Sequence, residues 1–288
     1  MKTIDTLISD IYSLVQQKDG WFNEDLARTL SDSIASRLRT QLGADTRKPT
    51  LRLSAMGPRC PKALWYSVHH SEMAEALPPW AEIKYSYGHV LEALVIALAK
   101  AAGHSVTGEQ DALKLDGIVG HRDCVIDGCL VDVKSASSRS FVKFKDGSIG
   151  QSDTFGYLDQ LDGYVVASAE DPLVVDKDHG YLLAVDKQLG HLALYRHEVR
   201  HGSIRERIKE YKEIVAKSNP PACNCGTEPQ GRSGNIRLDT RARYSPWKFC
   251  CFPSLRTFLY ASGPEYLTKV VRTPDVTEID KYGKVVYN

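Results

Sequence analysis

The sequence predicts a mixed α/β fold, in which a mixed central sheet is flanked by helices. The order of the elements supports this prediction, because helical periodicity both precedes and follows a group of expected strands. Within those strands, Asp127-Gly128 lies between two apolar runs and favours the two-residue turn of a β-hairpin. The 288 residues, 42% hydrophobic and 25% charged, have the composition of a globular protein.

Hydrophobic periodicity indicates the elements in turn. Apolar residues three and four positions apart predict helices, and alternating or continuous apolar runs predict strands. We expect helices at 4–15, 23–42, 61–69 and 81–102, strands within 111–135, a helix at 154–169, a strand at 179–186 and a helix at 203–218. Residues 219–250 are rich in Pro, Gly and Arg and poor in apolar residues, so something other than a core should hold them.

These elements suggest three regions: an N-terminal helical region (1–80), a core (81–218) and a C-terminal cysteine-containing segment with a tail (219–288). The formal net charge is +1, so binding of nucleic acid would need a local basic groove. The N-terminus lacks the pattern of a signal peptide, and no stretch approaches the roughly 18 apolar residues of a membrane span. We therefore expect a soluble, cytoplasmic protein without a membrane partner.

Two aspartates and a lysine fall on one face of the expected hairpin. With the turn at 127–128, opposing positions sum to 255, so Asp123 lies opposite Asp132, with Cβ atoms about 4.5–5.5 Å apart. Lys134 shares that face, and His121 is its expected cross-strand partner. Opposed carboxylates repel, and a divalent cation between them would remove the repulsion. The set indicates a Mg²⁺ or Mn²⁺ site, although a solvated Asp–Lys pair is the alternative.

The other face of the hairpin carries apolar side chains and should pack in the core. Its members are Cys124, Ile126, Cys129, Val131 and Val133. Cys124 and Cys129 are therefore expected to be buried thiols without a chemical role.

Glu92 lies in the expected helix 81–102, which is apolar on nearly every side and should be buried. One stripe at helical spacing consists of Leu91, Leu94, Val95 and Leu98. A buried carboxylate is costly unless it is paired or binds a metal, so Glu92 is a candidate ligand. The alternative is a glutamate at the helix edge that reaches water. Gly88, one turn earlier, would allow close backbone approach.

In this order, the residues resemble the RecB-like branch of the PD-(D/E)xK nucleases, which includes CRISPR-associated exonucleases. The matching segments are Gly88…Glu92, GHRD ending at Asp123, VDVK at 131–134 and QLDGY at 160–164, which is similar to the Gln-xxx-Tyr signature of that branch. The resemblance covers roughly residues 55–265. It implies a restriction-endonuclease-like core at 81–218.

The resemblance also implies roles for individual residues. Asp123 and Asp132 would bind the metal, Lys134 would be the catalytic lysine, and Gln160 and Tyr164 would contact the active site and DNA. Many relatives have a histidine at the position of Glu92, where a carboxylate can serve the metal directly or through water. The implied activity is that of a Mg²⁺- or Mn²⁺-dependent exonuclease acting on single-stranded DNA or DNA ends.

Seven cysteines are present, and in a cytosolic protein they indicate thiols or metal ligands more than disulfides. Many members of the branch hold a four-iron, four-sulfur (4Fe-4S) cluster with one early and three late cysteines. Cys60 resembles the early ligand, and Cys223, Cys225 and either Cys250 or Cys251 resemble the late ones. Adjacent residues rarely both ligate one centre. Zinc is the alternative metal, because thiolates suit both.

Phosphate binding needs basic side chains near the site, and Arg139 and Lys143 are the first candidates. Others follow in the cysteine-containing segment: Arg232, Arg237, Arg241 and Arg243, with Tyr244 and Trp247 as stacking residues. Two alternatives to an exonuclease stay open: a DNA endonuclease of the same fold, and a non-catalytic DNA-binding adaptor. A phage origin, with action in the host cytoplasm, is compatible with either.

Overall fold

Two units make up the structure, a computed structural model that describes residues 2–18, 20–43 and 48–286. Unit 1 comprises Met1–Lys48, Arg52–Gly57 and Leu77–Glu206, and unit 2 comprises Pro49–Leu51, Pro58–Ala76 and Arg207–Asn288, in each case for the described positions. The three regions expected from the sequence stay a prediction, and they include residues 1, 19, 44–47 and 287–288, which lie outside the described residues.

Unit 1 holds elements of both the expected N-terminal helical region and the expected core. They are η1 (Ile4–Thr6), α1 (Leu7–Val15), α2 (Glu24–Leu42), η2 (Leu53–Ala55), α4 (Pro79–Ala101), β1 (Val106–Thr107), β2 (Ala112–Leu115), β3 (Ile118–His121), β4 (Cys124–Ile126), β5 (Cys129–Ala136), α5 (Ser138–Lys145), α6 (Ile149–Ser152), α7 (Tyr157–Ala167), β6 (His179–Asp186), β7 (Leu192–Glu198) and the start of α8 (His201–Val215). Helix α2 begins where expected, because the Asn23 side chain accepts a hydrogen bond from the Leu26 N–H at 2.9 Å. Helix α5 and strand β7 were not expected.

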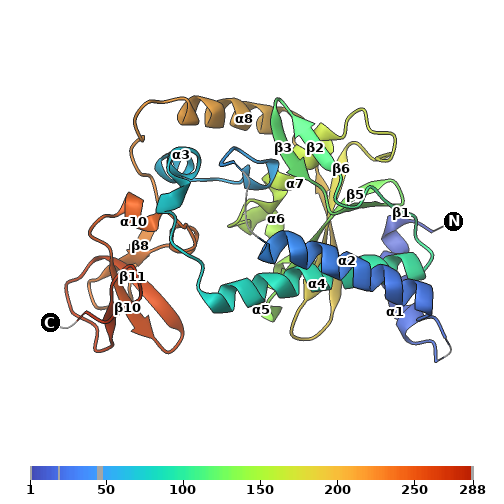
Figure 1. Ribbon diagram of the computed structural model, residues 1–288, viewed down its shortest axis with the longest axis horizontal. Coiled ribbons are helices and arrows are strands. Elements are labelled where there is room, and N and C mark those ends of the chain that lie inside the picture. The colour runs from blue at the N-terminus through green and yellow to red at the C-terminus, as the bar shows by residue number, and fades with distance from the viewer. Residues whose placement is uncertain (1, 19, 44–47, 287–288) are drawn as a thin grey trace. The chain divides into compact units, whose positions relative to one another are not determined.

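A five-stranded mixed sheet forms the centre of unit 1. The strand order is β1-β4-β5-β6-β7, in which β5 and β6 run parallel and the other neighbours antiparallel. Strands β2 and β3 form a separate antiparallel pair. Helix α2 packs along α4 (Figure 1). The expected α/β fold with a mixed central sheet flanked by helices is confirmed.

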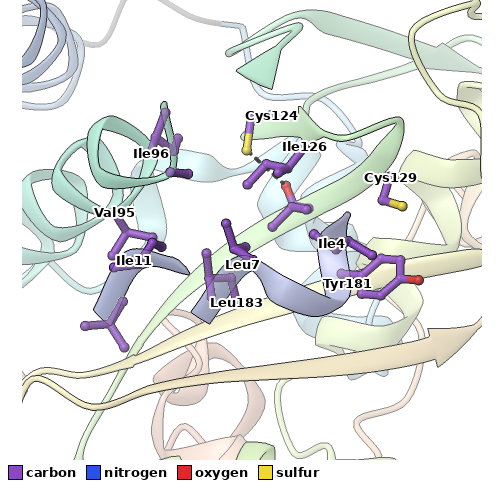
Figure 2. Packing of buried hydrophobic residues seen from close by; sticks show 13 residues of the cluster. Ile4, Leu7, Ile11, Val95, Ile96, Cys124, Ile126, Cys129, Tyr181 and Leu183 are labelled. Carbon is purple, nitrogen blue, oxygen red and sulfur yellow. Dashed lines mark hydrogen bonds between the residues drawn. The ribbon is translucent and has the colours of Figure 1, made fainter. Parts of the chain in front are cut away.

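One face of this sheet packs against α1 and α4 (Figure 2). The cluster includes the expected packing face of the hairpin: Cys124, Ile126, Cys129 and Val131 are buried in it, and Val133 packs against it. Burial raises the pKa of both thiols, that of Cys129 to about 11, so they are protonated at neutral pH.

The stripe expected on α4 is only partly right. Val95 is buried, and Leu91 and Leu98 pack against the same cluster, but Leu94 is 37% exposed. The buried face of the helix is centred on Val95, Ile96 and Ala99. Leu94 lies outside that face because 3.6 residues per turn rotate it away from the sheet.

Unit 2 contains short elements around a second sheet. They are α3 (Pro61–His69), η3 (Ser71–Met73), the remainder of α8, β8 (Thr227–Pro229), β9 (Ile236–Leu238), α9 (Thr240–Arg243), α10 (Lys248–Cys251), β10 (Arg256–Tyr260), β11 (Gly263–Lys269) and β12 (Glu278–Ile279). The sheet is antiparallel, in the order β12-β10-β11-β9-β8. Among the described residues, no helix is both long and apolar enough to cross a membrane.

Candidate functional site

The hairpin of β4 and β5 has the expected register. Its pairs are Cys124↔Val131, Val125↔Leu130 and Ile126↔Cys129, which all sum to 255. Asp127 and Gly128 both have positive φ, at 50° and 80°, as a type I′ turn requires. Asp123 directly precedes β4, and Asp132 lies one position beyond the last pair of this ladder, Cys124↔Val131. Asp132 is 2% exposed, and the Asp123 carboxylate accepts a hydrogen bond from the Val133 N–H at 2.7 Å.

The expected pairing of His121 with Lys134 is wrong. His121 belongs to β3 and pairs with Ala112, and the β5 residue Lys134 pairs in parallel with Ala184 of β6. Arg122 and Asp123 lie between β3 and β4 and belong to neither strand. The buried Arg122 guanidinium contacts Asp111 and Asp171 and donates to the Gly108 carbonyl, so it fixes the segment that directly precedes Asp123.

Lys134 lies between two groups that were also expected in the site. Its Nζ is 2.6 Å from Asp132 Oδ2 and donates to Gln160 Oε1 at 3.2 Å. The Gln160 amide donates to Asp132 Oδ1 at 3.1 Å and to the Tyr164 hydroxyl at 3.0 Å. The structure therefore brings Asp132, Lys134, Gln160 and Tyr164 into one network.

Helix α7 supplies Gln160 and Tyr164 to this network from one helical face. The helix comes close to β6 at Gly180, where a Cβ would lie 2.5 Å from Leu161 Cγ. Asp162, fully buried on α7, accepts from Arg200 Nε at 2.8 Å and lies 2.7 Å from His197 Nε2. These contacts fix the helix and hence the Gln160 amide.

Charges in this network shift each other's protonation. Desolvation is the main cause that raises the pKa of Asp123, and the charges of Asp132 and Glu92 add to it. Desolvation also raises the pKa of Asp132, although Lys134 opposes the shift. Burial would lower the pKa of Lys134, but the charges of Asp132 and Asp123 outweigh it and raise this pKa. Lys134 is therefore an ammonium at neutral pH.

Two carboxylates of this site fit a divalent cation. Asp132 is buried, and its carboxylate lies 2.6 Å from the Lys134 ammonium through Oδ2 and accepts from Gln160 through Oδ1. Oxygen donors of this kind suit Mg²⁺ and Mn²⁺. Asp123 and Asp132 would hold such an ion, whose charge would offset the burial and the neighbouring carboxylates that raise their pKa values.

Glu92 is buried but separately held. Its Oε1 accepts hydrogen bonds from Arg37 Nη1 and, at 2.9 Å, from Gln110 Nε2. His89 Nδ1 lies 3.7 Å from Oε2. Among the described residues, the carboxylates of Glu92, Asp123 and Asp132 do not form a set whose ligand atoms all lie within 4.8 Å of one another. Glu92 is near enough to affect the aspartates electrostatically, and its metal-binding role stays a prediction.

Three neighbours of the site escaped the sequence analysis. Tyr157 places its ring 4.7 Å from Lys134 Nζ, a cation–π contact. Gln110 and Arg37 hold Glu92. Gln110 has a positive φ of 57°, which is uncommon for a residue other than glycine, but this conformation leaves no clear pattern in the sequence.

The basic residues expected to contact DNA do not join this network in the described part of the chain. Arg139 is exposed on α5, and Lys143 Nζ donates to the Ser152 carbonyl at 3.2 Å. In unit 2, Arg237 and Arg243 both pair with Glu265, at 3.3 and 3.4 Å. These two arginines thus stabilise unit 2 internally, which accounts for them without DNA.

Four cysteine sulfurs form a second site, within unit 2. Those of Cys60, Cys223, Cys225 and Cys251 all lie within 4.8 Å of one another. Cys60 immediately precedes α3 and Cys251 ends α10, and Trp247 packs beside the group. Cys250 is not a member, since its Sγ lies against the Met73 carbonyl at 4.0 Å. The set could bind a metal, and it selects Cys251 from the adjacent pair.

The thiols of this group cannot all ionise without a cation. Hydrogen bonds from Cys225 and Cys251 lower the pKa of Cys60. Hydrogen bonds with Cys225 and Cys60 raise the pKa of Cys251, and a hydrogen bond with Cys60 raises that of Cys225 against the opposing effect of Cys251; burial and the charges of neighbouring thiolates add to both increases. A metal ion or cluster would remove the repulsion and keep all four sulfurs as thiolates.

Comparison with known proteins adds little to this geometry. No protein-family model and no curated protein matches the chain. Among solved structures, it is similar to SSO0001 with a TM-score of 0.40 and 12% identity, over 80% of this chain and 96% of that one. It is also similar to an alkaline exonuclease (LHK-Exo) from Laribacter hongkongensis, with a TM-score of 0.35 and 14% identity, over 65% and 91%. At such low scores these likenesses carry no functional inference.

One prediction follows directly from the raised pKa of Asp123. Because its pKa is higher in the folded than in the unfolded chain, ionisation destabilises the fold. This penalty is absent below the unfolded value of about 3.9 and grows as pH rises through the folded pKa. We expect Asp123→Asn, which can still accept from Val133 N–H, to stabilise the protein at pH 7 without divalent cations. The gain should be about 1.4 kcal/mol for each pH unit of elevation.

Thermal unfolding from pH 4 to pH 8 tests this expectation. The melting temperatures of the variant and the wild type should converge toward pH 4 and separate at neutral pH. Mn²⁺ should stabilise the wild type more than the variant. A variant that is less stable than the wild type at pH 7 without cations would contradict the electrostatic argument.

Proposed function

We propose that this chain is a Mg²⁺- or Mn²⁺-dependent DNA nuclease of the PD-(D/E)xK type. The observation that supports it best is the Lys134 ammonium, held by Asp132 and Gln160 beside the Asp123 carboxylate. A solvated surface pair would not explain an aspartate that is only 2% exposed and whose carboxylate contacts both Lys134 and Gln160. Within this class, an exonuclease of the RecB-like branch, acting on single strands or ends, is the specific proposal.

Each residue of the network has a role in this reaction. A bound divalent cation would polarise the phosphate and the attacking water. Asp123 and Asp132 would hold that cation. Lys134 is charged at neutral pH and would stabilise negative charge on the phosphate rather than accept a proton. Gln160 fixes both Lys134 and Asp132.

Tyr164 joins the network through its hydrogen bond with Gln160. Its hydroxyl accepts from Gln160, and burial together with the charge of Asp132 raises its pKa, so it stays protonated. We propose that it positions Gln160 and retains a hydroxyl proton for a DNA contact. Glu92 would assist the metal from its position on α4.

For the four cysteines we propose a 4Fe-4S cluster, with zinc as the alternative. The support is a set of four sulfurs from two segments of unit 2 that lie far apart in the sequence, one at Cys60 and the other at 223–251. Such a centre would connect α3 with the segment 219–250, whose apolar core is small. We expect this centre to stabilise the fold of unit 2 and to take no part in hydrolysis.

A cleavage assay tests the nuclease proposal. Purified protein would be incubated with end-labelled linear and with closed circular single-stranded DNA, with Mn²⁺ and with EDTA. We expect Mn²⁺-dependent release of short products from the linear DNA only. Asp132→Asn should be inactive at low Mn²⁺, because it weakens the metal site, and should regain part of its activity at high Mn²⁺.

Asp178→Asn is the matched control. Asp178 is an exposed aspartate of unit 1, so this variant should cleave DNA like the wild type. Cleavage of the circular substrate would favour the endonuclease. Binding of DNA without cleavage of any substrate would favour the non-catalytic adaptor and refute the nuclease.

A further inference from the structure

Arg37 forms a buried ion pair with the third carboxylate of the site. Its guanidinium donates to Glu92, and the two side chains are only 7% and 11% exposed. Arg37 lies on α2, and its Nε also donates to Ser33 on that helix, at 3.3 Å. A residue that belongs to neither the hairpin nor α7 therefore determines the surroundings of Glu92.

Gln110 links this ion pair to the hairpin. Its side chain donates to the Glu92 oxygen that Arg37 also contacts, and its backbone N–H donates to the Asp123 carbonyl at 3.2 Å. Gln110 adopts a left-handed backbone conformation, with φ of 57°, to make both contacts. A single residue, Gln110, thus connects the Arg37–Glu92 ion pair to Asp123.

The pair resolves an electrostatic problem that exists without a divalent cation. A buried carboxylate without a counter-charge is costly, and Arg37 supplies that charge to Glu92. A divalent ion at Asp123 and Asp132 would supply positive charge to the same group of carboxylates. Arg37 and the ion would then repel each other in a site of low dielectric constant.

We infer that Arg37 is a built-in counter-ion that competes with the divalent cation for Glu92 and so weakens cation binding. This inference rests on the proposed cation site at Asp123 and Asp132. Arg37 is a positioning residue in this scheme, because it acts through Glu92. Arg37 would thus stabilise the site when no metal is bound, and it would lower the affinity of the site for the metal.

The test compares Mn²⁺ binding by calorimetry, with Mn²⁺ alone as the ligand, and thermal stability without cations. We expect Arg37→Met, which keeps an apolar stem but loses the charge, to bind Mn²⁺ on the order of tenfold more tightly. The same variant should melt at a lower temperature than the wild type without Mn²⁺, and this deficit should shrink when Mn²⁺ is added. A purely structural residue would not improve one property while it worsens the other.

Four further variants make the result specific. Arg37→Lys keeps the charge and should bind Mn²⁺ within about threefold of the wild type. Arg37→Gln keeps a donor for Glu92, is the safer variant if Arg37→Met fails to fold, and should also bind more tightly. Arg39→Met, at an exposed position of the same helix, should match the wild type in both measurements. Glu92→Gln should bind Mn²⁺ more weakly.

The outcomes separate the inference from the proposed function. If Asp132→Asn binds Mn²⁺ as well as the wild type does, the cation site itself is wrong. If Asp132→Asn loses Mn²⁺ binding but both charge-removing variants of Arg37 bind with unchanged or lower affinity, the site stands and the role of Arg37 is overturned.

Discussion

Replacing Lys134 with alanine is expected to lower the rate of DNA cleavage by on the order of 10³-fold, while DNA affinity stays close to that of the wild type and the protein still folds. Lys134 projects from the face of β5 opposite to the core cluster, so its loss removes no packing against Val131 or Cys124. Its charge acts mainly where negative charge grows on the phosphate in the transition state. An interaction of that kind lowers turnover when it is lost.

Single-turnover cleavage and DNA binding, measured on the same preparations, test this expectation. Lys114→Ala removes an exposed lysine from β2 of the same unit and should cleave like the wild type. High Mn²⁺ should restore part of the activity of Asp132→Asn but none of that of Lys134→Ala, because only the aspartate variant has a weakened metal site. Near-normal cleavage by Lys134→Ala would remove the hairpin from the mechanism and favour the adaptor.

The hairpin could be predicted because its geometry is local. A two-residue turn fixes the register, and the alternation of side chains then places Asp132 and Lys134 on one face. The same rule failed at His121, because it assumes that both strands continue. The chain instead turns away at Arg122, whose partners Asp111 and Asp171 come from distant parts of the sequence.

Long-range pairs account for what the sequence did not indicate at the site. Arg37 precedes Glu92 by 55 positions, and no periodicity of α2 distinguishes it from the neighbouring Arg39. Gln110 lies in a connection whose conformation is set by tertiary contacts. The aspartates and the lysine were indicated by the hairpin register and the alternation of side chains, whereas the role of Gln160 was implied by the resemblance of its segment to a family signature.

The second sheet was missed for a different reason. Strands β8, β9 and β12 span only two or three residues each, which is too short for alternation to stand out from loop sequence. Residues 219–250 were expected to need support beyond an apolar core. Their buried apolar clusters are small and lie around the cysteines, which agrees with that expectation. The sequence could not choose between Cys250 and Cys251, because the choice depends on how α10 ends.

Replacing Cys60 with serine is expected to abolish metal binding by unit 2 and to loosen the segment 219–250. Cys60 is the only one of the four clustered cysteines that comes from the α3 side of the unit, so its loss would separate the remaining three sulfurs from α3. The buried cluster around these sulfurs is small, so the proposed centre would contribute much of the local stability. Metal analysis, visible absorption of anaerobically purified protein and limited proteolysis of the segment measure the effect.

Cys250→Ser is the matched control, because its sulfur lies outside the four-sulfur group and contacts the Met73 carbonyl instead. It should retain the metal, the absorption and the resistance to protease of the wild type. Brown protein that bleaches on reduction indicates an iron–sulfur cluster, and colourless protein with stoichiometric zinc indicates the zinc alternative. Retention of metal by Cys60→Ser, or its loss from Cys250→Ser, would contradict the assignment of the four ligands, because each result would require a different set of sulfurs around the metal.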